Sequence, residues 1–134
     1  MRYLLDTDIS SYVVRGKYAG IRKRLVSIPT SEVAISAVTR AELLYGVQRL
    51  PGNHALQQAV RQFSSIVQTL AWAASAADQY AEVHHYLVST GRPIGEKDEM
   101  IASHALAIDA TLVTNNTRHF ERVRPQLRLE NWTP

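Results

Sequence analysis

Three acidic residues stand where a globular fold has little structural use for a negative charge. Asp6 directly follows a short apolar run, Glu42 lies in a helix-like segment that is apolar on most sides, and Asp98 opens another such segment. At helical spacing Asp98 heads the row formed by Ile101 and Ala102, so its side chain is expected to point inward. These three carboxylates are the first candidates for chemistry.

Each acid also has an ordinary structural explanation. Asp6 could cap a helix, because Asp is favoured where a side chain accepts from free backbone N–H groups. Glu42 could pair with Arg40 or Arg49 on a surface, and Asp98 could offset a helix dipole, an effect of about 0.3–1 kcal/mol. Singly none is persuasive, but a parallel sheet would bring all three to one edge, which favours a shared site.

Carboxylates that share one edge would repel one another and lose hydration. Both effects raise their pKa values and weaken the fold. A divalent cation removes this conflict, and because the chain has no Cys, oxygen ligands suited to Mg²⁺ or Mn²⁺ are expected. Such an ion lowers the pKa of bound water and offsets charge on a phosphoryl oxygen. The pattern therefore predicts metal-dependent phosphodiester hydrolysis.

Short strands alternate with longer helices along the chain. The alternation predicts right-handed crossovers and a three-layer α/β/α fold whose mainly parallel sheet has about five strands. In such folds functional groups gather beyond the carboxyl ends of the strands. The expected strands are 2–5, 33–36, 66–69, 111–114 and 127–129, the last at an edge, and the expected helices are 9–14, 21–26, 38–50, 54–63, 75–88 and 97–108.

Composition sets the remaining bounds. The 134 residues carry a formal charge of +3 and are 46% hydrophobic, without a linker or repeat, so residues 1–134 are expected to form a single domain. No apolar run is long enough to span a bilayer, and Asp6 and Asp8 interrupt any N-terminal signal, which predicts a cytoplasmic protein without membrane contact. No Gly-rich phosphate loop or G-x-S-x-G motif occurs.

Four sets of residues, in order along nearly the whole chain, carry a resemblance to a known family. They are residues 3–9 (YLLDTDI), 35–43 (ISAVTRAEL) with Gly46, 93–102 (PIGEKDEMIA), and 112–120 (LVTNNTRHF) with 129–132 (LENW). Together they resemble the PIN-domain ribonucleases, and among these the VapC-like toxins of bacterial toxin–antitoxin systems. The resemblance implies a PIN-like fold.

The resemblance also implies an activity and roles for particular residues. It implies a Mg²⁺- or Mn²⁺-dependent endoribonuclease that cleaves RNA, such as a tRNA or another structured RNA, by metal-activated water. Asp6 and Asp98 would be the principal ligands, and Glu42 would bind directly or through water. Thr7 and Thr114 would help to orient ligands or water.

Two positions depart from the family pattern. Where many relatives carry a fourth acid after the strand at 111–114, this chain has the neutral Asn115 and Asn116, which leaves open whether either takes that place and whether one or two metal ions bind. Where the family commonly has Asn, this chain has Asp8, which is expected to cap the following helix. The family further implies a small cognate antitoxin that covers the acidic edge, and a homodimer.

Basic residues form two groups that could contact RNA phosphates. Arg15 and Lys17 belong to the first, with Tyr12 and Tyr18 nearby for base stacking, and Arg118 and Arg122 belong to the second. A solvated surface explains each of them equally well. The five histidines show no metal-ligand spacing and are predicted to be structural.

Two other functions compete with the nuclease. The Asp6-Thr7-Asp8 run resembles the D-x-D nucleophile of haloacid-dehalogenase-like phosphatases, but the later acidic pair of those enzymes is missing and Glu42 would have no role. The alternative from a different class is a catalytically weak PIN-like module that only binds RNA or protein, which the neutral Asn115 and Asn116 keep open.

Overall fold

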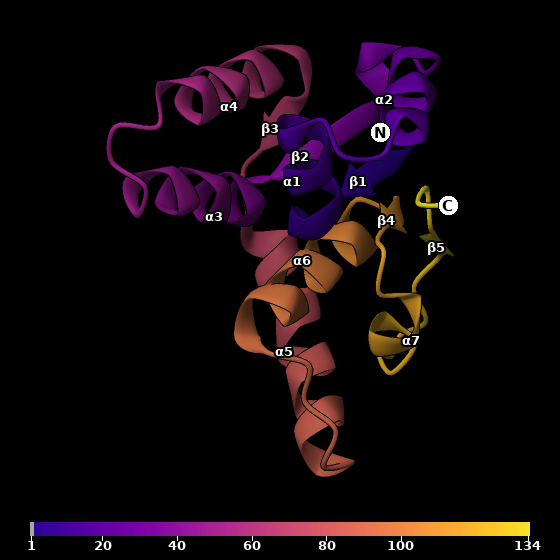
Figure 1. The fold of residues 1–134 in the computed structure, drawn as a ribbon. Coiled ribbons are helices and arrows are strands. Elements are labelled where there is room, and N and C mark those ends of the chain that lie inside the picture. Colours follow the sequence, from indigo (N-terminus) through magenta and orange to yellow (C-terminus); the bar gives the residue numbers. More distant parts are fainter. Residues whose placement is uncertain (1) are drawn as a thin grey trace.

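A five-stranded parallel sheet forms the middle layer of the computed structural model, which describes residues 2–134. The strand order is β3-β2-β1-β4-β5, with β1 paired to both β2 and β4 (Figure 1). The direction of chain progression therefore reverses beside β1, where a ligand crevice is expected. The strands are β1 (Tyr3–Leu5), β2 (Val33–Ser36), β3 (Gln68–Leu70), β4 (Thr111–Val113) and β5 (Leu129–Glu130).

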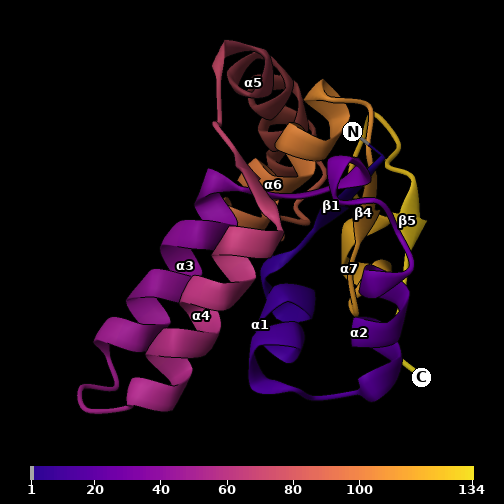
Figure 2. The same cartoon turned by 90° about the horizontal axis from the view of Figure 1, so that it is seen from above.

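Helices cover both faces of this sheet. Alternate residues of a strand point to opposite faces, and so Leu5 packs with the helices α1, α2 and α4, whereas Leu4 packs with α5 and α6. In Figure 2, α3 and α4 lie side by side, and α5 lies against α6. The three-layer α/β/α prediction is confirmed. The helices are α1 (Thr7–Arg15), α2 (Ala19–Val26), α3 (Ala37–Gln48), α4 (His54–Ile66), α5 (Ala74–Ser89), α6 (Glu96–Ala107) and α7 (Thr117–Phe120), with a 3₁₀ turn η1 (Thr30–Glu32).

Local residue types determine where α3 and α6 begin, the two helices that carry Glu42 and Asp98. Ser36 ends β2 and caps α3, because its hydroxyl accepts from the amide of Val38 at 3.1 Å. Gly95 immediately precedes α6 with φ of 103°, a conformation that strains residues with a Cβ. Gly95 thus fixes where α6 begins, and with it the position of Asp98.

Apart from shifts of one or two residues at other element ends, the structure differs from the expected elements at α4, at the edge strand and in two short additional elements. The helix expected at 54–63 continues to Ile66, because Val60, Phe63 and Val67 all bury side chains on the same core, and β3 starts only at Gln68. The edge strand is β5 at Leu129–Glu130 rather than 127–129. The short elements α7 and η1 were not expected. Among residues 2–134, no helix combines the length and apolar character needed to cross a membrane.

Candidate active site

Asp6 lies at the carboxyl end of the central strand and is held by several backbone contacts. Its amide donates to Val113 O at 2.9 Å, and its carboxylate Oδ1 accepts from the amide of Ile9 at 2.8 Å. The hydroxyl of Ser10 donates to Asp6 O at 2.8 Å. Asp6 is therefore the N-cap of α1, which corrects the prediction that Asp8 caps this helix. Asp8 is an exposed residue in the first turn.

The carboxyl of Asp6 is an unfavourable place for a charge. The residue is only 3% exposed, and this burial is the main reason that its pKa is raised to about 7. The Thr114 hydroxyl and the Ile9 amide donate to it and oppose the rise, whereas the charges of Asp8 and Asp98 add to it. The group is therefore poised to change charge near neutral pH.

Asp98 lies in the first turn of α6, where its side chain is 41% exposed. Burial raises the pKa of Asp98, the nearby His119 lowers it, and the charges of Glu42 and Asp8 raise it further. The Nε2 atom of His119 lies 3.2 Å from Asp98 Oδ2 and 2.9 Å from Ile94 O. The contacts place His119 between the loop before α6 and the candidate acid.

The interpretation of all five histidines as structural missed His119. His104 fits that interpretation, because it is buried against the Ser36 hydroxyl at 2.8 Å and burial lowers its pKa. His119, by contrast, contacts Asp98 across a gap of 21 residues. No spacing motif signals such a pair, and the available hint was that His119 follows the strand 111–114, at the same edge as the acids.

Glu42 projects from α3 and is bound by Thr7. The Thr7 hydroxyl donates to Glu42 Oε1 at 2.6 Å, and its oxygen lies 3.1 Å from the buried Thr39 Oγ1. Among residues 2–134, Glu42 makes no ion pair with either arginine proposed as its partner: Arg40 donates to Thr69 and Arg49 lies over Tyr45. The surface-pair explanation of Glu42 is therefore wrong.

The three acids come from three elements to one edge of the sheet, but their carboxylates do not form a compact cluster around a common centre. The charge of Asp98 raises the pKa of Asp6, and the charge of Glu42 raises that of Asp98, so the groups lie within electrostatic reach. Within the described residues 2–134, no three acidic or His groups form a ready-made metal cluster. Instead, the Glu42 carboxylate accepts a hydrogen bond from the Thr7 hydroxyl, and the Asp98 carboxylate contacts the His119 ring. A shared ion stays a prediction.

The donors at this edge fit a hard divalent cation. They are the carboxylate oxygens of Asp6, Glu42 and Asp98 and the hydroxyl oxygens of Thr7 and Thr114, and Mg²⁺ and Mn²⁺ prefer oxygen ligands. The raised pKa of the buried Asp6 carboxyl shows that its charge has too little stabilisation from the protein alone. A cation beside it would supply that stabilisation.

The residues after β4 have different surroundings. Thr114 is buried, and its hydroxyl accepts from the amide of Asn116 at 2.9 Å. Asn115 donates to Tyr12 Oη at 3.1 Å and accepts from the Thr133 hydroxyl at 3.0 Å, so its amide ties the C-terminal segment to α1. Asn116 is exposed and makes no side-chain capping bond to α7. Of the two, Asn116 is the better candidate for the place of a fourth acid.

The two basic residues predicted to contact RNA near the N-terminus have different surroundings. Arg15 lines a cavity of about 140 Å³ together with Thr7 and Glu42. Lys17 lies over the rings of Tyr12 and Tyr18, with its Nζ 5.1 and 5.0 Å from their centroids. Of these two residues, Arg15 is thus the one that lines a cavity together with an acid of this edge.

The second basic group is less uniform. Arg118 is exposed on α7, whereas the Nε atom of Arg122 is buried and has no hydrogen-bond partner among the described residues. Arg128, a further arginine of this group, is paired with Asp109 at 2.9 Å, and Arg24, from the basic run near the N-terminus, is paired with Glu130 at 3.0 Å. Arg24 and Arg128 therefore already have ion-pair partners within the protein, and RNA binding by Arg118 and Arg122 stays a prediction.

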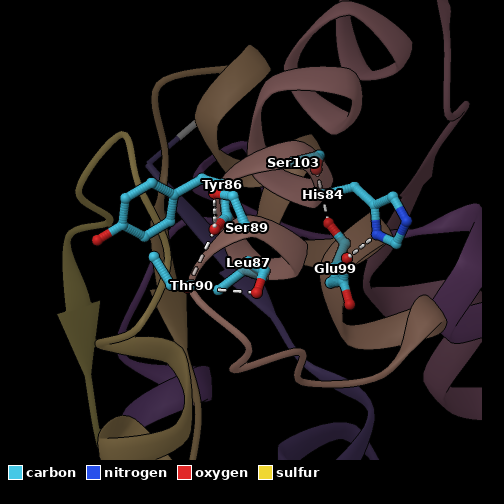
Figure 3. Close-up of polar contacts among 7 residues, drawn as sticks. All are labelled: His84, Tyr86, Leu87, Ser89, Thr90, Glu99 and Ser103. Carbon is cyan, nitrogen blue, oxygen red and sulfur yellow. Dashed lines mark hydrogen bonds and ion pairs between the residues drawn. The ribbon is translucent and has the colours of Figure 1, made fainter.

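Behind Asp98, the next residue is a buried acid with one close partner. Glu99 is 1% exposed, and its Oε1 lies 2.6 Å from His84 Nδ1 on α5, while its backbone carbonyl accepts from the Ser103 hydroxyl (Figure 3). The His84 ring also stacks on Tyr80 at a centroid distance of 5.4 Å. This pair joins α5 to the first turn of α6, the turn that carries Asp98.

His84→Ala is expected to lower the free energy of unfolding by about 1–3 kcal/mol at neutral pH, because it leaves the Glu99 carboxylate buried without its partner. Urea unfolding followed by circular dichroism measures the change. The matched control is His85→Ala, which removes the exposed neighbouring ring. Adding Glu99→Gln to His84→Ala should recover part of the loss, and equal stability of the two histidine variants would contradict the role of the pair.

Comparison with known proteins finds one matching domain family and several similar curated proteins. The PIN domain family profile matches residues 3–125. The chain is 35% identical over 133 residues to "tRNA(fMet)-specific endonuclease VapC" of Shigella flexneri, covering 99% of both chains. It is 37% identical over 133 residues to "Ribonuclease VapC2" of Rickettsia felis, covering 98% of both.

A solved structure agrees with the sequence matches. The fold superposes on a chain of DNA-bound VapBC from Salmonella typhimurium with a TM-score of 0.91 and 33% sequence identity, covering 98% of both chains. The likeness extends over the whole sheet and its helices, including the edge that carries the acids.

Proposed function

Because the chain belongs to the PIN-domain family, within its VapC branch, we propose that it is a divalent-metal-dependent endoribonuclease that acts as the toxin of a toxin–antitoxin pair. The names of its relatives support ribonuclease activity. The observation that carries the proposal is the buried Asp6 at the end of β1, whose pKa is raised by burial and by the acids around it.

Asp6, Asp98 and Glu42 are the residues that would hold the cation, with Thr7 and Thr114 beside them. When bound, Mg²⁺ or Mn²⁺ would lower the pKa of a water molecule and offset the charge that develops on a phosphoryl oxygen. Its binding would also stabilise the buried charge of Asp6, whose pKa is raised mainly by burial and further by the charges of Asp8 and Asp98. The number of ions is left open by the neutral Asn115 and Asn116.

The surrounding residues hold these ligands in place. Asp6 is fixed by its capping bond to Ile9, so its free oxygen has a defined direction. The Thr7 hydroxyl donates to Glu42 and thereby orients that carboxylate from the start of α1. His119 does the same for Asp98 from α7. Such supporting bonds reduce the motion of ligand groups and increase the affinity of a site.

The substrate and the partners follow from the same family. We propose a structured RNA such as a tRNA as substrate, in keeping with the Shigella relative. A cognate antitoxin is supported by the VapBC assembly of the Salmonella structure. An apolar cavity of about 310 Å³ between α1, α2 and α4, lined by Val13, Leu25 and Phe63 among others, suits a protein partner better than RNA. A homodimer stays an expectation.

The test is incubation of the purified protein with total RNA and with tRNA, in Mn²⁺ or in EDTA. Cuts are expected only with Mn²⁺, with 5′-phosphate and 3′-hydroxyl ends on mapping. Asp98→Asn, purified in the same way, should cut at least about 10²-fold more slowly, because a preorganised charged group has been removed. Equal cutting by the variant would point to a contaminating nuclease, and no cutting of any RNA would favour the binding module.

A further inference from the structure

A second cavity adjoins the acidic edge and has a different chemical character. Its volume is about 730 Å³, and it opens between the start of α1, the outer face of α3 and the first turn of α6. Through Thr7 and Glu42 it is continuous with the candidate active site. Its lining residues are Thr7, Ala41, Glu42, Tyr45, Arg49 and Lys97.

Tyr45 is the aromatic residue of this cavity, one helical turn after Glu42. It is 65% exposed, so its ring contributes little to the core. The guanidinium carbon of Arg49 lies 5.4 Å from the ring centroid, which places a cation over the ring. With that much exposed surface the ring still offers a flat area to a ligand. Exposed aromatic rings beside cations are the surfaces on which unpaired bases stack.

The charges of the cavity suit a polyanion. The lining includes two cationic side chains, Arg49 and Lys97, and one acidic side chain, Glu42, so it carries one more positive than negative charge. Lys97 lies on α6, immediately before Asp98, whereas Arg49 is the C-cap residue of α3, so the two cations approach the cavity from different elements. The adjoining cavity of about 140 Å³ shares Arg49 and adds Arg15. Cations that line adjoining cavities could bind phosphates of the same strand.

We propose that this cavity binds one unpaired nucleotide of the RNA substrate beside the phosphate that is cut, with the base stacked on Tyr45 and the flanking phosphates bound by Arg49 and Lys97. The proposal rests on the proposed function, because it takes the acids as the place of cleavage. Stacking does not read base edges, so the subsite selects an unpaired nucleotide rather than a particular base.

A protein segment is the other class of ligand to consider at this surface. Its apolar side chains would gain little in a cavity that mixes a carboxylate with two cations. The apolar cavity between α1, α2 and α4 offers such a segment a better surface. The charges and the exposed ring together therefore favour the nucleotide.

The test measures RNA binding in the Asp6→Asn background with Mg²⁺ present, so that cleavage does not interfere. The probe is a short fluorescein-labelled RNA without self-complementarity. Tyr45→Ala should raise the Kd about 5-fold or more, the effect of losing one base–aromatic stack. Tyr45→Phe should bind like the parent. The matched control is Tyr86→Ala, which removes an exposed ring on α5.

Salt dependence tests the phosphate contacts separately. Arg49→Ala and Lys97→Ala should each reduce the slope of log Kd against log salt by about 0.7, the value for one phosphate contact on a single strand. Arg49→Lys should keep most of the slope, since it keeps the charge. Thermal melting of each variant confirms that it is folded.

Two results would overturn the subsite. One is unchanged RNA affinity in Tyr45→Ala and in both cation variants. The other is a change in molar mass or in antitoxin binding with unchanged RNA affinity, which would assign the surface to a protein contact. Weaker RNA binding by Tyr45→Ala in a protein that cuts no RNA would support the subsite while refuting the nuclease, so the two failures are distinguishable.

Discussion

Asp6→Asn is expected to slow RNA cleavage by at least about 10²-fold and, at the same time, to make the metal-free protein more stable above neutral pH. The first effect follows from the loss of a ligand charge at the proposed metal site. The second follows from burial, because the carboxylate at this position is desolvated and lies near Asp8 and Asp98. Asn keeps the side-chain oxygen that caps α1.

The sign of the stability effect can be derived from the pKa. The pKa of Asp6 is about 7 in the folded protein, against 3.8 for an unperturbed aspartate side chain. Between these two pH values the folded state binds more protons than the unfolded state, so the free energy of unfolding falls as pH rises and levels off above about 7. The loss amounts to as much as about 4 kcal/mol at roughly 1.4 kcal/mol per pKa unit.

The measurement is urea unfolding across this pH range in EDTA. The wild-type protein should lose stability between the two pKa values, and Asp6→Asn should show a flatter profile that lies above the wild type at high pH. Asp78→Asn is the control, because it removes an exposed acid on α5 whose charge does not contribute to the raised pKa of Asp6. Parallel profiles for wild type and Asp6→Asn would contradict the assigned pKa.

Mg²⁺ or Mn²⁺ is expected to raise the Tm of the wild-type protein by about 10 °C at a concentration of about 100 times its Kd. Binding to the folded state alone contributes about 2.7 kcal/mol at that ratio, and 1 kcal/mol corresponds to about 4 °C in a chain of this size. The shift should shrink as pH falls below about 7, because protons compete with the metal for Asp6.

Asp98→Asn should remove most of this shift while leaving the metal-free fold intact. Differential scanning calorimetry with and without the metal, at constant ionic strength set by NaCl, separates specific binding from screening. An Asp98→Asn protein that is unfolded without metal would make Asp98 structural. A full Tm shift in both Asp98→Asn and Asp6→Asn would show that the metal binds elsewhere on the protein, which would contradict the proposed site.

Much of the architecture was predictable because it depends on local patterns. The apolar run at 33–36, typical of a buried strand, is the strand β2, and the apolar periodicity before Ile108 is the helix α6. Their alternation is enough to imply a parallel sheet, because right-handed crossovers leave few other arrangements. The meeting of Asp6 and Asp98 at one edge follows from that topology. Asp6 follows the carboxyl end of β1, and α6, which carries Asp98 in its first turn, leads back to the start of the parallel neighbour β4.

By itself, the sequence determined the order of the elements, the layers and the candidate acids, since residue types and spacing act over a few turns of chain. Only the tertiary structure decided that Asp6 rather than Asp8 caps α1, that His119 reaches Asp98, and that Tyr45 faces a cavity beside the acids. Some of these contacts join residues that are far apart in the chain. The capping of α1 depends instead on which of two nearby acids is buried at the end of β1. The energies of these contacts arise from packing and desolvation, which exist only once the layers have come together.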